Sequence, residues 1–310
     1  MRALLKVVLP LVILSGCNAV AWQRGRLERG LTAQGIETKT IRLGPDSVRY
    51  RDGGEGETLL FLHGFGASAL WQWAPQVELL SEGRRIIFPD LLWFGGSSST
   101  DKDYSLNHQI RMVSNLVEHI GGGPVHVIGI SYGGLVGYGL ASLNPKQVKS
   151  LVLIDSPGRS FDSKDYEAML KRLGVRHIAD ALLPETPEDV GRLLELAYAD
   201  PPYTPNFVKR QVLSELYGEF MEEKRGLLED LVNNRVQLHK EAQALAVPAM
   251  VIWGELDTLF PVAVGEQTAE DTGATLHIIK GAGHSPNLEK PEEVAQLIRQ
   301  FIEGLPELKK

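Results

Sequence analysis

The stretch Pro124–Gly134, PVHVIGISYGG, constrains the fold more than any other part of this sequence. An apolar run rich in β-branched residues ends at Ile130, and Ser131 follows between Gly129 and Gly133. The residues after it have the pattern of a helix. Because small residues on both sides let the backbone bend tightly, we expect a sharp strand-to-helix turn. Such a turn exposes the serine hydroxyl at the carboxyl end of a sheet.

Other short apolar runs predict a mostly parallel sheet around this strand. The runs are 58–62, 85–88, 148–154, 249–253 and 275–279, and the clearest helical patterns are 106–120 and 291–302. Continuous apolar runs of this length fit strands that are buried on both faces, and their alternation with helices predicts βαβ units. Residues 38–43 and 47–52 alternate polar and apolar side chains around a Gly-Pro-Asp turn, which predicts an antiparallel hairpin.

The pattern changes between about residues 158 and 246. This stretch is charged, its apolar spacing is helical, and it contains no buried strand run. Prolines interrupt it at Pro184, Pro187, Pro201 and Pro202. The 310 residues are enough for one large α/β domain with an insertion. We therefore predict a core formed by residues 38–157 and 247–310, with a helical insertion at 158–246.

These features together resemble the α/β-hydrolase superfamily. The resemblance implies an α/β fold, with a mostly parallel central sheet flanked by helices and an inserted helical cap. It also implies catalytic residues in the chain order serine, acid, histidine. Trp253-Gly-Glu-Leu-Asp257 follows the penultimate strand, and Gly281-Ala-Gly-His284 follows the last strand. By resemblance, Ser131 is the nucleophile, His284 is its general base, and Asp257 orients His284.

The acid has two alternatives. Glu255 lies two residues before Asp257, although the spacing Trp-Gly-x-x-Asp matches the family at Asp257. Asp155 follows the sixth strand, where some relatives carry their acid. Among the eight histidines, only His284 combines a glycine-flanked loop with the expected order, whereas His63 belongs to a His-Gly loop that is usually structural.

Resemblance also indicates the groups around the nucleophile. The backbone N–H groups of Phe65 and Tyr132 are the expected oxyanion donors. Where relatives carry a Pro-Gly-x-Gly-x-Ser loop, this chain has Trp93 and Phe94, which either line an acyl pocket or pack beneath the cap. Trp71 is a further candidate for the pocket. Four more aromatic residues either form an apolar substrate wall or pack in the core: Trp73, Tyr198, Tyr203 and Phe207.

The first seventeen residues have the pattern of a signal peptide. Arg2 and Lys6 precede the apolar run 7–14, which is too short to span a bilayer as a mature helix. The run ends in Leu-Ser-Gly-Cys, which resembles the lipobox of bacterial lipoproteins and implies a lipid anchor on Cys17, the only cysteine. The alternative is an ordinary signal peptide with a chance cysteine. We predict that residues 18–37 form a polar, helical tether.

The resemblance implies a bacterial serine hydrolase tethered to the cell envelope, an esterase or lipase that acts on small apolar esters or lipids. Asn18 after the cysteine favours the outer membrane in a Gram-negative cell. The same triad also serves metal-free perhydrolases, C–C bond hydrolases and amidases, and a non-catalytic envelope lipoprotein is a further alternative. The net charge of −7 is spread along the chain without a basic stripe, which argues against nucleic acid. The sequence contains no metal-ligand spacing, phosphate loop or dinucleotide fingerprint, so we expect no metal or organic cofactor.

Overall fold

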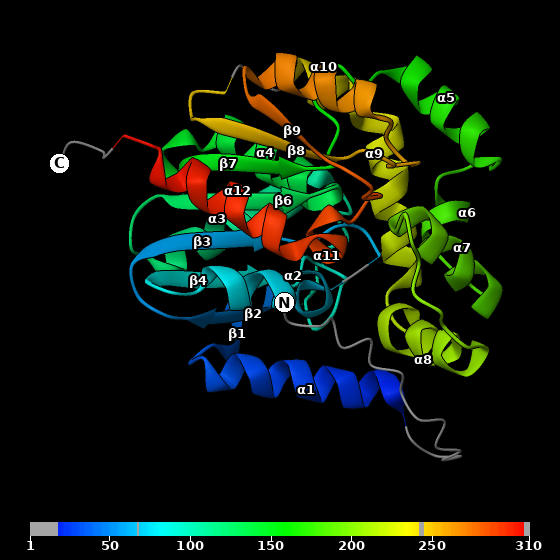
Figure 1. Ribbon diagram of the computed structural model, residues 1–310, viewed down its shortest axis with the longest axis horizontal. Coiled ribbons are helices and arrows are strands. Elements are labelled where there is room, and N and C mark those ends of the chain that lie inside the picture. The colour runs from blue at the N-terminus through cyan, green and yellow to red at the C-terminus, as the bar shows by residue number, and fades with distance from the viewer. Residues whose placement is uncertain (1–17, 67, 242–244, 307–310) are drawn as a thin grey trace, which may run out of the picture.

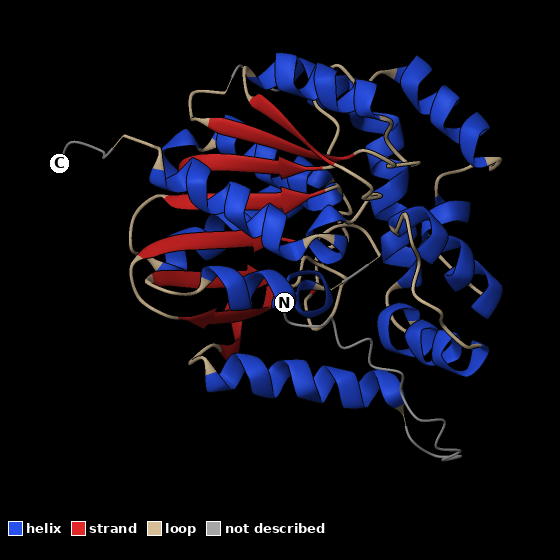
Figure 2. Ribbon diagram, viewed as in Figure 1, coloured by secondary structure: helices blue, strands red, loops and turns tan. Residues whose placement is uncertain are grey.

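The computed structural model describes residues 18–66, 68–241 and 245–306, with side chains of 235–241 excluded. The predicted signal peptide and Cys17 lie outside these residues. Within the described part of the chain, one nine-stranded sheet carries helices on both faces (Figures 1 and 2). None of the described helices is both long enough and apolar enough to cross a membrane.

The strands follow the order β1-β2-β4-β3-β6-β7-β8-β9, and β5 pairs with β2. In this order, β2 is antiparallel to both of its neighbours, β1 and β4. All later neighbours, from β4 and β3 to β8 and β9, are parallel. The predicted hairpin and the predicted strands are present, and their ends agree with the sequence patterns to within one residue. The bounds are β1 Glu37–Leu43, β2 Asp46–Gly53, β3 Glu57–Leu62, β4 Arg84–Pro89, β5 Ser98–Ser99, β6 Val125–Ile130, β7 Val148–Ile154, β8 Ala249–Gly254 and β9 Thr275–Ile279.

Alternate side chains of each central strand enter different apolar cores. In β3, Leu60 and Leu62 face the core under α3, α4 and α10, while Leu59 and Phe61 face the core under α2 and α12. This double burial explains why the strands read as continuous apolar runs. The helices outside the cap are α1 Ala19–Ala33, α2 Ala69–Leu80, α3 Leu106–Ile120, α4 Tyr132–Leu143, α10 Val262–Thr272, α11 Pro286–Glu289 and α12 Pro291–Glu303.

Helices α5 to α9 gather at the carboxyl ends of the parallel strands, on the right in Figure 1. They span α5 Ser163–Leu173, α6 Ala179–Leu182, α7 Pro187–Ala197, α8 Asn206–Tyr217 and α9 Met221–Glu241. All five fall within the 158–246 insertion expected from the sequence. They therefore cover the edge of the sheet at which the Ser131 turn emerges.

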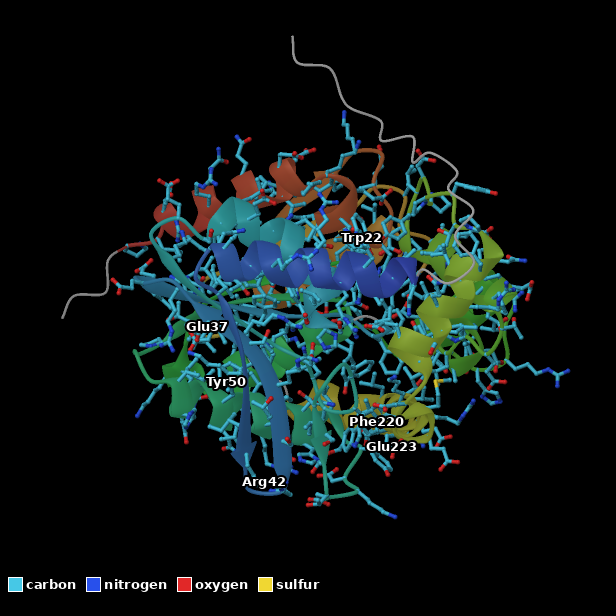
Figure 3. The ribbon with its side chains drawn as sticks, turned by 90° about the horizontal axis from the view of Figure 1, so that it is seen from below. Trp22, Glu37, Arg42, Tyr50, Phe220 and Glu223 are labelled. Atoms are coloured by element: carbon cyan, nitrogen blue, oxygen red, sulfur yellow. The ribbon has the colours of Figure 1, made fainter. Side chains whose placement is uncertain are left out.

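The segment 18–37 differs from the expected tether because its helix packs against the rest of the protein. Helix α1 contacts α2 and α8, and its Val20 and Leu31 are buried. The Val20 N–H donates to Gln211 Oε1 of α8 at 3.4 Å, and Arg24 pairs with Glu215 of the same helix at 2.6 Å. Charged residues separate the few apolar ones along the sequence, so the buried stripe of the helix is hard to see. Figure 3 shows α1 lying across the molecule, with its first turns beside the cap helices.

Candidate active site

Ser131 occupies a strained turn between β6 and α4. Its backbone has φ 51° and ψ −120°, a left-handed conformation that is unusual for a non-glycine residue. The surrounding backbone holds this conformation: the Ser131 N–H donates to the carbonyl of Ile154 at 2.9 Å, and its own carbonyl accepts from Ser156 Oγ at 2.9 Å. A Cβ on Gly133 would overlap the carbonyl oxygen of Leu62, so the turn requires glycine there.

His284 lies on the loop after β9 and is bonded to Asp257, which lies on the loop after β8. The distance from His284 Nδ1 to Asp257 Oδ2 is 2.8 Å. The other oxygen, Oδ1, accepts the N–H groups of Leu259 at 2.7 Å and Phe260 at 2.9 Å. Three donors thus face this buried carboxylate and fix its orientation. With Nδ1 turned to Asp257, Nε2 is the ring nitrogen left for a partner in the cavity that His284 and Ser131 both line.

The two alternative acids have other environments. Asp155 is fully buried at the end of β7, and its Oδ1 accepts the N–H of Gly254 at 2.8 Å. Burial raises the pKa of the Asp155 carboxyl well above its ordinary value, and the nearby charge of Asp257 raises it further. Of the two buried carboxyls, Asp155 is therefore the one whose surroundings disfavour the charged form. Glu255 instead accepts the N–H of Gly281 at 2.8 Å, on an exposed turn.

Asp155, Asp257 and His284 also form the one group of possible metal ligands found among the described residues. Their ligand atoms lie within 4.8 Å of one another. However, His284 and Asp257 are already bonded to each other, and burial raises the pKa of the Asp155 carboxyl. These three groups are therefore better suited to sharing protons in hydrogen bonds than to coordinating a metal ion.

The loop that carries Phe65 lies directly against the Ser131 turn. A Cβ placed on Gly64 would stand 3.4 Å from the Cβ of Ser131. His63 anchors this loop: its Nε2 accepts the N–H of Leu91 at 2.9 Å, so its Nδ1 is the donor to the carbonyl of Gly64 at 2.8 Å. Burial lowers the pKa of His63, which keeps the ring neutral, as these bonds require. The structural role expected for His63 therefore fits its contacts.

Tyr132 provides the first N–H of α4. The first N–H groups of a helix have no acceptor within the helix, and they carry the positive end of its dipole. Phe65 and Tyr132 also contact each other, with ring centroids 5.7 Å apart. The two residues expected to supply oxyanion donors are thus in contact with each other beside Ser131.

A tyrosine of the cap holds the same loop from the opposite side. Tyr217 of α8 donates its hydroxyl to the carbonyl of Gly66 at 2.7 Å. Lys224 of α9 lies over the Tyr217 ring, with its Nζ 5.4 Å from the centroid, and burial lowers the pKa of this lysine to about 8. No sequence pattern indicated Tyr217, because the bond joins residues 151 positions apart.

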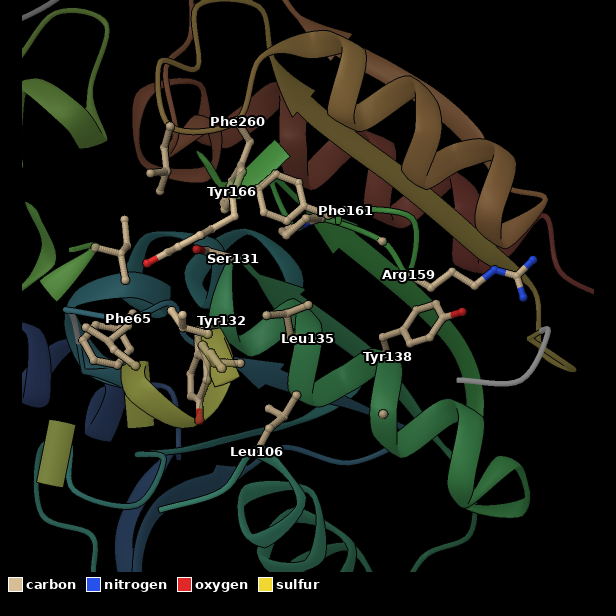
Figure 4. A pocket seen from close by; sticks show the side chains of 18 of the residues that line it. Phe65, Leu106, Ser131, Tyr132, Leu135, Tyr138, Arg159, Phe161, Tyr166 and Phe260 are labelled. Carbon is tan, nitrogen blue, oxygen red and sulfur yellow. The ribbon is translucent and has the colours of Figure 1, made fainter. Parts of the chain in front are cut away.

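Two cavities meet at Ser131. The larger measures about 390 Å³, is also lined by His284, and lies among α1, α2, α7 and α8; we call it the His284 cavity. The smaller measures about 170 Å³ and lies along α4 beneath α5 and α9; we call it the α4 cavity. Phe65, Leu182 and Leu259 line both cavities together with Ser131. Figure 4 shows the aromatic and aliphatic side chains that surround Ser131 in the α4 cavity.

Trp93 and Phe94 lie outside both linings. Trp93 packs edge-on against Tyr104, with ring centroids 4.9 Å apart, and Phe94 packs edge-on against Phe65 at 5.1 Å. Both side chains are almost completely buried. Of the two roles considered for them, packing beneath the cap matches these contacts. Phe94 still supports Phe65 from behind.

The remaining aromatic candidates divide by position. Trp71 and Tyr198 line the His284 cavity. Trp73 is fully buried and packs against the core, whereas Tyr203 and Phe207 are exposed, by 93% and 52%, and line neither cavity. Two of these five residues therefore line a cavity that Ser131 also lines.

Comparison with known proteins agrees with this fold. Residues 57–291 match the family described as alpha/beta hydrolase fold. The chain belongs to this α/β-hydrolase family. It is 30% identical to Lipase 1 of Psychrobacter immobilis over 283 residues, which cover 88% of this chain and 86% of that protein. It is 27% identical to the monoacylglycerol lipase ABHD6 of Homo sapiens, over 80% of this chain and 76% of that protein.

The solved structures similar to this α/β hydrolase include that of a membrane phospholipase A described as a bacterial virulence factor. The TM-score is 0.76 and the sequence identity is 26%, and the match covers 92% of this chain and 93% of that chain. Because nearly the whole of each chain is matched, the likeness includes the cap as well as the sheet.

We predict that Tyr217→Phe lowers the free energy of unfolding by about 1 kcal/mol, because the variant loses one hydrogen bond to the Gly66 carbonyl. Chemical denaturation with urea measures this difference. Tyr203→Phe is the matched control, since that hydroxyl group belongs to an exposed residue. Equal stability of the two variants would show that the bond between cap and loop contributes nothing.

Proposed function

We propose that this α/β hydrolase cleaves carboxylic esters with Ser131 as nucleophile, His284 as general base and Asp257 as the orienting acid. The observation that carries the proposal is the 2.8 Å bond from His284 Nδ1 to Asp257, at the wall of a cavity that Ser131 also lines. The roles require this arrangement, because the base must be held by its acid through one nitrogen and face the nucleophile with the other.

The proposed reaction begins with attack of Ser131 Oγ on the ester carbonyl carbon. The hydroxyl proton passes to His284 Nε2, and the Asp257 carboxylate stabilises the resulting imidazolium. Two backbone N–H groups, of Phe65 and Tyr132, hold the oxyanion of the tetrahedral intermediate. The C–O bond to the alcohol then breaks, and His284 returns the proton to the leaving oxygen. A water molecule attacks the acyl-Ser131 by the same route and releases the carboxylic acid.

Apolar acyl esters of the lipid type are the substrates that the site favours. Aliphatic and aromatic side chains form most of both cavity walls, and a few polar groups lie near Ser131. The relatives include proteins named as a lipase and a monoacylglycerol lipase, together with a structure named as a membrane phospholipase A. Their names support ester hydrolysis for this chain, and we extend it to small esters and lipids.

We further propose that the enzyme is held at the bacterial envelope by a lipid on Cys17. The support is the Leu-Ser-Gly-Cys sequence at the end of a short apolar run. Two or three acyl chains at this residue would bind a membrane firmly, since each buried methylene contributes about 0.8 kcal/mol.

Ser131→Ala should lower ester turnover by about 10⁴-fold or more while the protein remains folded, because no other described group replaces the nucleophile. The measurement is hydrolysis of p-nitrophenyl esters from acetate to palmitate by protein that starts after Cys17. The acyl-chain length at which the wild-type protein hydrolyses these esters fastest separates an esterase from a lipase. A variant that keeps most of the activity refutes the assignment. An inactive wild type would instead favour the perhydrolase, C–C hydrolase or non-catalytic alternatives.

Asp257→Asn and Asp155→Asn should differ sharply. We expect Asp257→Asn to reduce kcat by roughly 10⁴-fold, since an amide no longer selects the right tautomer of His284 or stabilises its cation. Asp155→Asn should keep activity within about tenfold, because burial holds that carboxyl neutral and an amide has nearly its shape. Steady-state kinetics of both variants decides between the two acids. The opposite ranking would make Asp155 the catalytic acid.

Cys17→Ala should remove the full-length protein from the membrane fraction or block its maturation, because no other residue offers a thiol for acylation. Fractionation of expressing cells, followed by detection of the protein in each fraction, tests this expectation. Ser131→Ala is the control and should stay with the membranes. Unchanged membrane retention of Cys17→Ala would disprove the lipid anchor.

A further inference from the structure

Part of the His284 cavity is built by a segment that lies outside the matched family region. Ala19, Val20 and Gln23, all in the first two turns of α1, line this cavity, whereas the family match begins at residue 57. The opposite walls come from the cap helices α7 and α8. Helix α1 thus lies before the matched family region, and its first two turns line a cavity of the candidate active site.

The first turns of α1 are fixed in place against α8. Val20 is only 6% exposed, and its N–H donates to Gln211. One turn later, Arg24 pairs with Glu215. These two bonds join the first turns of α1 to the middle and the end of α8. The wall that α1 offers to the cavity is therefore ordered rather than a loose flap.

The position of His284 distinguishes the two cavities chemically. His284 lines the His284 cavity and is absent from the lining of the α4 cavity. In the proposed reaction, His284 gives its proton to the oxygen of the departing alcohol. The alcohol must therefore lie on the side of His284, and the acyl chain extends from Ser131 in the other direction, along Leu135 and Phe161 (Figure 4).

The wall of the His284 cavity determines which alcohols fit. Opposite α1, aliphatic side chains line it, including Leu194 of α7 and Val208 and Val212 of α8. On the α1 side, Val20 adds another aliphatic group and Gln23 adds a polar one. An aliphatic chain finds apolar surface along most of this route, while a charged alcohol would lose its hydration without a matching partner.

We propose that the first two turns of α1 are a specificity-determining element that forms the wall of a leaving-group site for alcohols with an apolar chain of several carbons. The proposal rests on the proposed function, because it uses the proton transfer from His284. It assigns the His284 cavity to the alcohol and the α4 cavity to the acyl chain. The substrates so defined carry apolar chains on both sides of the ester bond.

Tryptophan substitutions in α1 test the assignment. Val20→Trp and Gln23→Trp should fill the far part of the His284 cavity. The readout is the ratio of kcat/KM for octyl butyrate to that for ethyl butyrate. Each methylene that loses its apolar contact lowers kcat/KM by about fourfold, so the loss of two or more lowers the ratio by tenfold or more. Gln23 is partly exposed, so its variant still decides the matter if Val20→Trp fails to fold.

Two matched variants control for bulk and for the other cavity. Arg26→Trp adds the same side chain to an exposed position of α1 outside both linings, and its octyl-to-ethyl ratio should equal that of the wild type. Leu135→Trp should lower activity on ethyl decanoate relative to ethyl butyrate, while it leaves the alcohol ratio unchanged. If folded Val20→Trp and Gln23→Trp keep the wild-type alcohol ratio, or change the acyl ratio instead, the proposal is overturned.

A binding measurement separates this proposal from the proposed function. Calorimetric titration of 1-octanol into Ser131→Ala protein reports occupation of the cavity without turnover. Adding Val20→Trp to that protein should weaken binding by tenfold or more, whereas adding Arg26→Trp should not change it. Weakened binding together with an inactive wild type would support the site and reject the catalytic roles. Equal binding in both double variants would reject the site.

Discussion

The close approach of three backbone segments at the Ser131 turn is the constraint on which the site depends. The start of α4 passes over the end of β3 with no room for a side chain at Gly133, and over the end of β6 with none at Gly129. This contact sets the height at which Ser131 stands above the sheet and the direction of the first N–H groups of α4. It also places Ser131 where both cavities begin. A larger residue at either glycine would push α4 away from the strands. Ser131 and the first N–H groups of α4 would then be displaced as well.

Two carboxyl groups are buried behind His284, and their surroundings differ. Three N–H donors surround Asp257, while Asp155 has one N–H donor at its Oδ1 and sits deeper. A second buried charge next to the first is unfavourable, and burial together with the charge of Asp257 raises the pKa of the Asp155 carboxyl. The pair therefore offers His284 one well-oriented carboxylate. The electrostatics of the proposed triad thus depend on a residue that no step of the reaction uses.

Local patterns predicted the sheet and most of the candidate site, but contacts between distant segments lay beyond them. Strands and helix α3 follow from the period of apolar residues, and the Asp257 and His284 loops follow from glycine-flanked spacing. Helix α2 was not predicted, because Pro75 lies inside it and apolar residues surround it. The packing of α1 on α8 and the bond from Tyr217 to Gly66 join segments more than 150 positions apart. Whether Trp93 lines a pocket or packs in the core depends on its tertiary contact with Tyr104. The local sequence pattern does not indicate that contact.

The hydrogen bond from Tyr217 to Gly66 links the position of the cap to the conformation of the loop that carries Phe65. A Cβ on Gly66 would come within 2.6 Å of the Tyr217 oxygen, so a side chain at this position would displace the hydroxyl group that makes the bond. The bond forms only while the cap and the loop both hold these positions, so it favours the two positions together. One hydrogen bond of about 1 kcal/mol biases that equilibrium roughly fivefold. Contacts of a ligand with the cap and with the Phe65 loop are therefore linked through this one bond.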